Sequence, residues 1–200
     1  MAWTDPIARV AQAGFDLAHA FDAHAAAREP GLEVLAGGGA LGILIGNTRA
    51  LWPPFRAALQ DPALAGEAHP LDRYTERAID AAFVGATIHY AHRTCGGTFL
   101  PFQRLAVAIG LGALSPSQLV IHPVYGPWFA MRAVIVVEGT APRRLPIAPP
   151  CRCEATCVTA FARASATADP HDWVAVREAC TVSAHRYTDE QIAYHYGRMG

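Results

Sequence analysis

The most constraining feature of the sequence is an apolar stretch, residues 110–139, that is interrupted by the motif HPVYGPW at residues 122–128. Residues 118–121 and 129–138 are rich in aliphatic and β-branched side chains, which predicts two strands joined as a hairpin. The prolines stiffen the connection, and Gly126 permits a backbone geometry or a close approach that is closed to larger residues. The motif is therefore either a rigid turn with a hydrogen-bonded core histidine or one wall of a ligand pocket.

Outside this stretch, helices and strands follow one another in uneven order. The pattern predicts helices over 5–28, 47–59, 69–94, 102–112 and 187–197, a further helix after the cysteines of the segment 151–166, and a short buried strand over 41–45. Thr188 and Gln191 fit a capping box at the start of the last helix. We expect an α+β fold in which helices cover one sheet, formed by a single domain over residues 1–200. A proline-rich connection at about 140–150 leads into a cysteine-rich segment at 151–157.

Composition excludes several classes of function. Hydrophobic residues make up 52% and charged residues 16%, which is typical of a globular chain and not of a disordered one. The 16 basic and 17 acidic residues nearly balance, so we expect neither nucleic acid nor a membrane surface as a partner. All the basic residues are arginine, which excludes lysine chemistry. No signal-peptide pattern and no bilayer-length apolar run is visible, so we expect a cytoplasmic protein.

Three separate blocks resemble the CblC (MMACHC) family of cobalamin-processing proteins. Residues 119–139 resemble the family's His-Pro-x-aromatic-Gly-x-Trp-Phe-Ala-x-Arg segment. Residues 42–60 with 69–79 are similar to its N-terminal strand and helices, and 186–197 to its Arg-Tyr-Ser-x-Glu-Gln-x-Ala-Tyr ending. Residues 108–129 also resemble a segment of epoxyqueuosine reductases and reductive dehalogenases, which use base-off cobalamin.

The resemblance implies a nitroreductase-like, flavin-reductase-related fold that binds cobalamin (vitamin B12) base-off. It further implies removal of the upper axial ligand, by reductive decyanation with reduced flavin (FMN or FAD) or by dealkylation with glutathione. A non-catalytic cobalamin carrier is the alternative, and a flavin or iron–sulfur protein without B12 is a further one. A B12-accepting protein or a flavin reductase would be the partner, and a homodimer stays open. The cofactor-binding residues that follow from the resemblance are His122, Pro123, Tyr125, Gly126, Trp128, Phe129, Arg132 and Arg177.

The cysteines depart from the family pattern. Cys151, Cys153 and Cys157 form a Cys-x-Cys-x3-Cys segment, where the animal family has one cysteine followed by arginines that help to hold glutathione. A cubane iron–sulfur cluster needs four thiolates at other intervals, and Cys180 is remote in the sequence. The segment is therefore interpreted as ordinary cysteines or as candidate catalytic thiols that replace glutathione, with an iron–sulfur cluster the least favoured choice.

Three further potential ligands occur at residues 89–95. The spacing i, i+3 and i+6 would place His89, His92 and Cys95 on roughly one helical face, where they could hold zinc together with a fourth ligand. Histidines near the carboxyl end of a helix more often interact with the helix dipole. We therefore predict no metal site.

Overall fold

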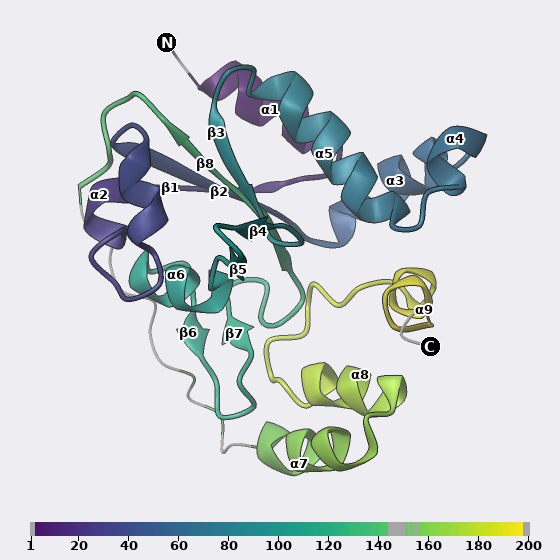
Figure 1. Cartoon of the computed structure of the whole chain (residues 1–200). Coiled ribbons are helices and arrows are strands. Elements are labelled where there is room, and N and C mark those ends of the chain that lie inside the picture. Colours follow the sequence, from purple (N-terminus) through teal and green to yellow (C-terminus); the bar gives the residue numbers. More distant parts are fainter. Residues whose placement is uncertain (1–2, 144–150, 152, 154–155, 198–200) are drawn as a thin grey trace.

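A four-stranded antiparallel sheet forms the centre of the computed structural model, which describes residues 3–143, 151, 153 and 156–197 (Figure 1). The strand order is β1-β2-β8-β3. The strands are β1 (Leu17–Asp22), β2 (Leu41–Asn47), β8 (Ala130–Val137) and β3 (Thr87–Tyr90). The described part of the chain thus forms an α+β domain with a central antiparallel sheet and helices around it, as the uneven order of its elements predicts.

Both faces of the sheet are buried, because helices cover each of them. Helices α1 (Thr4–Gln12), α3 (Trp52–Ala58) and α5 (Pro70–Ala82) pack on one face, where Ile43 and Ile45 point. Helices α2 (Ala23–Ala26) and α6 (Phe102–Ala108) pack on the other, where Leu44 points. Strand β2 is consequently apolar on both sides, as expected for a central strand.

The carboxyl-terminal part of the chain forms a helical layer beside the sheet, below it in Figure 1. It consists of α7 (Cys157–Thr167), α8 (Pro170–Glu178) and α9 (Asp189–Gly197). Trp128, two residues before β8, packs with Val174, Tyr187 and Ile192 and so attaches this layer to the sheet. The remaining short elements are η1 (Glu33–Gly37), η2 (Arg49–Leu51), α4 (Pro62–Ala65), β4 (Thr94–Cys95), β5 (Thr98–Phe99), β6 (Ala113–Leu114) and β7 (Val120–Ile121).

The helix expected over residues 5–28 is wrong, because α1 ends at Gln12 and the edge strand β1 follows. Gly14 has a φ of +91°, and a Cβ there would lie 2.6 Å from the Cα of Leu51, so only glycine fits this turn. Leu17 and Phe21 point inward with the two-residue period of a strand. The high alanine content of this segment concealed that period.

The helix expected over 69–94 is also too long. Helix α5 ends at Ala82, and the β-branched residues that follow form β3. His89 therefore lies on a strand, while His92 binds Glu76 through its Nε2 at 2.8 Å. The shared helical face of His89, His92 and Cys95 does not exist. Within the described part of the chain, no three His, Cys, Asp or Glu side chains are grouped as ligands of a metal ion.

The predicted hairpin between residues 118–121 and 129–138 is wrong as well. Strand β7 pairs with β6, whereas β8 pairs with β2 and β3 in the main sheet. Gln118 instead lies in the β6–β7 turn with a φ of +61°. The HPVYGPW motif therefore connects two different sheets.

Several sequence predictions are confirmed. The strand at 41–45 is β2, and the helices expected over 47–59, 102–112, 187–197 and after the cysteines of 151–166 correspond to α3, α6, α9 and α7. The hydroxyl of Thr188 accepts a hydrogen bond from the Gln191 amide at 3.2 Å, which is one half of the capping box. Most of the proline-rich connection, residues 144–150, lies outside the described residues. No helix among the described residues has the length and apolarity needed to cross a membrane.

Candidate functional site

The HPVYGPW motif folds into a closed turn. His122 and Gly126 exchange two backbone hydrogen bonds of 2.9 Å. The Nδ1 atom of His122 also accepts hydrogen bonds from the amides of Val124 and Tyr125, at 3.1 and 3.2 Å. An atom that accepts two N–H groups carries no proton, so His122 is a neutral imidazole with its proton on Nε2. The rigid turn with a hydrogen-bonded histidine, one of the two alternatives from the sequence, therefore accounts for the Nδ1 atom of His122.

Aromatic rings extend from this turn. The His122 ring stacks on Tyr125 with centroids 4.5 Å apart, and Tyr125 meets His185 edge to face at 4.8 Å. Burial, with smaller effects from the charges of His19 and His185, lowers the pKa of His122 to about 4. Tyr125 and His122 are both partly exposed. The turn thus presents a neutral aromatic surface that is rigid and accessible.

A second group of side chains, which we name the α9 polar cluster, lies next to this turn. It consists of Trp128, Arg132, Tyr187, Gln191 and His195. The Trp128 and Tyr187 rings are 5.6 Å apart, and those of Tyr187 and His195 are 5.7 Å apart. Tyr187 lies just before α9, and Gln191 and His195 follow it at intervals of four residues, which places the last two on one side of the helix.

The α9 polar cluster contains buried polar atoms that lack hydrogen-bond partners among the described residues. They are Trp128 Nε1, Tyr187 Oη, Gln191 Oε1 and Nε2, and His195 Nε2. An unpaired buried polar atom costs about 1–3 kcal/mol, so folded proteins rarely leave several together. Such a group is typical of a site where a ligand or ordered water supplies the missing partners.

Two arginines give the cluster its positive charge. Arg132 donates from Nε to the buried Oδ1 of Asn47 at 2.7 Å, and Arg177 donates from Nη1 to the Pro127 carbonyl. The guanidinium of Arg177 also lies 5.8 Å from the centre of the Trp128 ring. Neither arginine forms an ion pair within the part of the chain that the structure describes.

The electrostatic state of the cluster follows from its burial. Burial, followed by the charges of Arg132 and Arg177, lowers the pKa of His195 to about 3, so this imidazole is neutral at physiological pH. Burial raises the pKa of Tyr187, which keeps its hydroxyl protonated. The cluster and the adjoining Arg177 therefore offer two cations, neutral donors and neutral acceptors, and these six residues include no carboxylate or thiol.

Comparison with known proteins places this arrangement in a structural context. No family model matches the sequence, and no curated protein matches it. Among solved structures, a B12-trafficking protein CblC of C. elegans, described as a homologue of human MMACHC, superimposes with a TM-score of 0.62. The match covers 97% of this chain and 91% of that chain. This chain has a CblC-like fold. The two sequences are 15% identical, so the similarity concerns the fold.

The CblC-like fold confirms the resemblance seen in the three sequence blocks and brings most of the predicted residues into two adjacent groups. Trp128, Arg132 and Arg177 lie in or against the α9 polar cluster, and the 122–126 turn is next to them. Phe129 is buried on the opposite side, in the core beneath α6, with its ring 5.7 Å from His122.

Four residues of the site escaped prediction: Asn47, Tyr187, Gln191 and His195. The four-residue spacing of the last three was visible in the sequence. Without a partner surface, however, it did not distinguish a site from an ordinary buried helix face.

The candidate catalytic cysteines lie in neither group. Cys151, Cys153 and Cys157 line a small separate pocket, and Cys180, remote in the sequence, lines it too. Pro127 belongs to the wall of this pocket, while its carbonyl faces Arg177. The cysteine pocket is therefore a neighbour of the α9 polar cluster and not a part of it.

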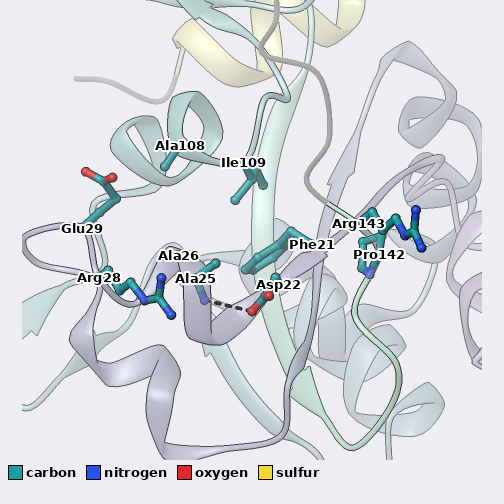
Figure 2. A pocket seen from close by; sticks show the side chains of 10 residues that line it. All are labelled: Phe21, Asp22, Ala25, Ala26, Arg28, Glu29, Ala108, Ile109, Pro142 and Arg143. Carbon is teal, nitrogen blue, oxygen red and sulfur yellow. Dashed lines mark hydrogen bonds between the residues drawn. The ribbon is translucent and has the colours of Figure 1, made fainter.

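A larger pocket, of about 340 Å³, lies elsewhere, between α2, the end of α6 and residues 142–143 (Figure 2). Phe21 forms its apolar floor, and Asp22 turns its carboxylate to the Ala25 amide at 2.8 Å. Arg28 and Arg143 approach it from opposite sides. None of the predicted site residues lines this pocket.

Proposed function

We propose that this protein binds cobalamin base-off at the α9 polar cluster and the adjoining 122–126 turn, and that it removes the upper axial ligand. The observation that carries the proposal is the set of five unpaired buried polar atoms beside Arg132 and Arg177 in a chain with a CblC-like fold. A ligand with many hydrogen-bonding groups on its rim would satisfy those atoms.

The chemistry of cobalamin fits the residues that are present. A corrin is a large, mostly apolar disc with a rim of amides, and its nucleotide tail carries a phosphate. Arg132 and Arg177 are suited to amide carbonyls or to that phosphate, because their guanidinium groups have no carboxylate partner among the described residues. The neutral His195 and Gln191 can accept from amide N–H groups. The stacked rings of His122 and Tyr125 offer a flat surface at the edge of the site.

The cluster itself holds no group that could transfer electrons or attack an alkyl ligand. Displacing the benzimidazole tail weakens the lower field of cobalt, so the bound molecule becomes easier to reduce, which is the chemistry that cobalamin supplies. The role of this chain is then to bind and to orient. We therefore propose reduced flavin or a thiol such as glutathione as the donor, and a cytoplasmic setting in which a B12-accepting protein receives the product.

Titration with hydroxocobalamin tests binding. The visible spectrum is expected to shift to the base-off form at one equivalent. Arg132→Gln should weaken binding by at least about tenfold, because a charge-assisted hydrogen bond contributes about 1.5–3 kcal/mol. Arg163→Gln is the matched control, since the Arg163 side chain is 74% exposed and pairs with Asp172, outside the α9 polar cluster. An unshifted spectrum with the parent protein would refute the assignment to cobalamin.

A second experiment separates the enzyme from a carrier. Cyanocobalamin is incubated anaerobically with the protein and reduced flavin, and an alkylcobalamin with the protein and glutathione. We expect loss of the upper ligand to be faster than in the absence of protein. Base-off binding combined with the uncatalysed rate would establish the carrier instead.

A further inference from the structure

The structure gathers four of the five cysteines in one place. Cys151, Cys153, Cys157 and Cys180 line a cavity of about 10 Å³, which we name the thiol pocket. Cys157 is the first residue of α7, and Cys180 follows the end of α8, so the helix pair α7–α8 brings them together. Cys95 lies on β4 and does not line this pocket.

Within the thiol pocket, one pair of sulfurs is distinguished by its geometry. The Sγ atoms of Cys151 and Cys153 are 3.2 Å apart, and both residues are partly exposed. A disulfide bond is about 2.05 Å long, so these sulfurs need to approach by roughly 1.1 Å. Cys157, in contrast, is buried at 4% exposure. Burial raises the pKa of Cys180, which disfavours its reactive thiolate.

The surroundings favour thiol chemistry over metal binding. Apart from Ser115 and Ser117, the walls of the pocket are apolar, formed by residues such as Ile121 and Val176. The four sulfurs are not arranged as ligands, since the described part of the chain contains no group of three or more potential ligands around a common point. A close, partly exposed pair of thiols is typical of a redox centre.

We propose that Cys151 and Cys153 form a reversible disulfide that exchanges two electrons with low-molecular-weight disulfides and thiols. One cysteine thiolate attacks a sulfur of the external disulfide, giving a mixed disulfide and releasing one thiol. The other cysteine then attacks the bonded cysteine sulfur and releases the second external thiol, while the two cysteine protons pass to the leaving thiolates. Because only one residue separates the two cysteines, the ring is small, which favours a labile bond. The proposal does not depend on cobalamin.

Peptide mapping tests this pair when it is combined with a Cys157→Ser variant, because Cys157 shares a tryptic peptide with Cys153. The reduced protein is incubated with excess oxidised glutathione, alkylated and digested with trypsin. Arg152 lies between the two cysteines, so cleavage separates them into peptides 145–152 and 153–163. We expect these two peptides to remain linked, and the free thiols of the denatured protein to fall from five to three. A dithiol reductant should restore all five.

Variants provide the controls. Cys151→Ser and Cys153→Ser should each abolish the intramolecular disulfide, whereas Cys157→Ser and Cys95→Ser should each leave it intact and lower both thiol counts by one. Loss of the linked peptides in Cys157→Ser would assign the bond to Cys157 and overturn the proposal. The proposal is overturned if the parent keeps five free thiols, or if peptide 178–186, which holds Cys180, is the one found linked. It is also overturned if purified protein carries one equivalent of metal that protects the thiols from oxidation.

Discussion

Gly126 is the residue of the HPVYGPW motif whose identity the backbone dictates. Its φ is +58°, and a Cβ there would lie 2.1 Å from the carbonyl oxygen of Val182. The left-handed conformation costs other residues about 1–2 kcal/mol, and the overlap would also displace the segment that packs on the turn. Gly126→Ala should therefore lower the free energy of unfolding by more than about 2 kcal/mol in urea denaturation. Gly85→Ala is the control, since Gly85 has a φ of +77° but a Cβ there would meet no other atom within 4 Å. Equal losses would contradict the role of the Val182 contact.

His122 should make stability depend on pH. Its folded pKa of about 4 lies below the ordinary value of 6.5, so between these values the unfolded chain binds the proton and the folded chain does not. The free energy of unfolding should therefore fall as pH decreases from 6.5 to 4. His122→Asn keeps a side-chain acceptor for the turn but does not titrate. For this variant, the free energy of unfolding should depend less steeply on pH. The difference in slope is at most about 1.4 kcal/mol per pH unit, the limit for a single titrating group. If urea denaturation over this pH range gave the same slope for the parent and the variant, protonation of His122 would not destabilise the folded state.

Among the helices and strands, the sequence predicted those that are defined by a pattern within their own residues. Strand β2 is a short apolar run and α9 carries its own cap, so both were found. Strand β1 was missed because its alanines resemble a helix, and its pairing with β2 decides the outcome. The predicted pairing of β7 with residues 129–138 was wrong because strand pairing depends on tertiary contacts. Residues 118–121 are compatible with either neighbour, and only the β6–β7 turn at Gln118 selects one.

Helix α9 contacts α3 through the ring of Tyr194, which packs on Trp52 and Phe55, and through one acidic side chain. Glu190 accepts hydrogen bonds from Trp52 Nε1 at 2.8 Å and from Arg56 at 3.2 Å. Glu190→Gln should lower the free energy of unfolding by about 1–2 kcal/mol, because the bond from the part-buried indole loses its charged acceptor. Asp189→Asn removes a charge from the same helix turn but affects an exposed pair with Arg186, so a loss of less than about 0.5 kcal/mol is expected. Thermal and urea denaturation of both variants provide the comparison, and equal losses would count against the Trp52 contact.

For the whole molecule, the candidate site depends on segments that are distant in the sequence. Arg132 belongs to β8, whereas Gln191 and His195 belong to α9, and Trp128 joins the two through its contact with Tyr187. The motif around residue 128 was recognisable by itself. The face of α9 that meets it is defined only by tertiary packing, and the same holds for the approach of Cys180 to the other cysteines.

Ligand binding at such a junction should stabilise the entire domain. A ligand that binds only the folded state at a hundred times its Kd adds about 2.7 kcal/mol, and each kcal/mol shifts the Tm of a domain of this size by about 2–4 °C. Excess hydroxocobalamin should therefore raise the Tm by roughly 5–10 °C in a calorimetric scan. Arg132→Gln should reduce this shift, while Arg163→Gln should retain it. A Tm that does not respond to hydroxocobalamin in the parent protein would mean that the unpaired atoms of the α9 polar cluster serve another ligand.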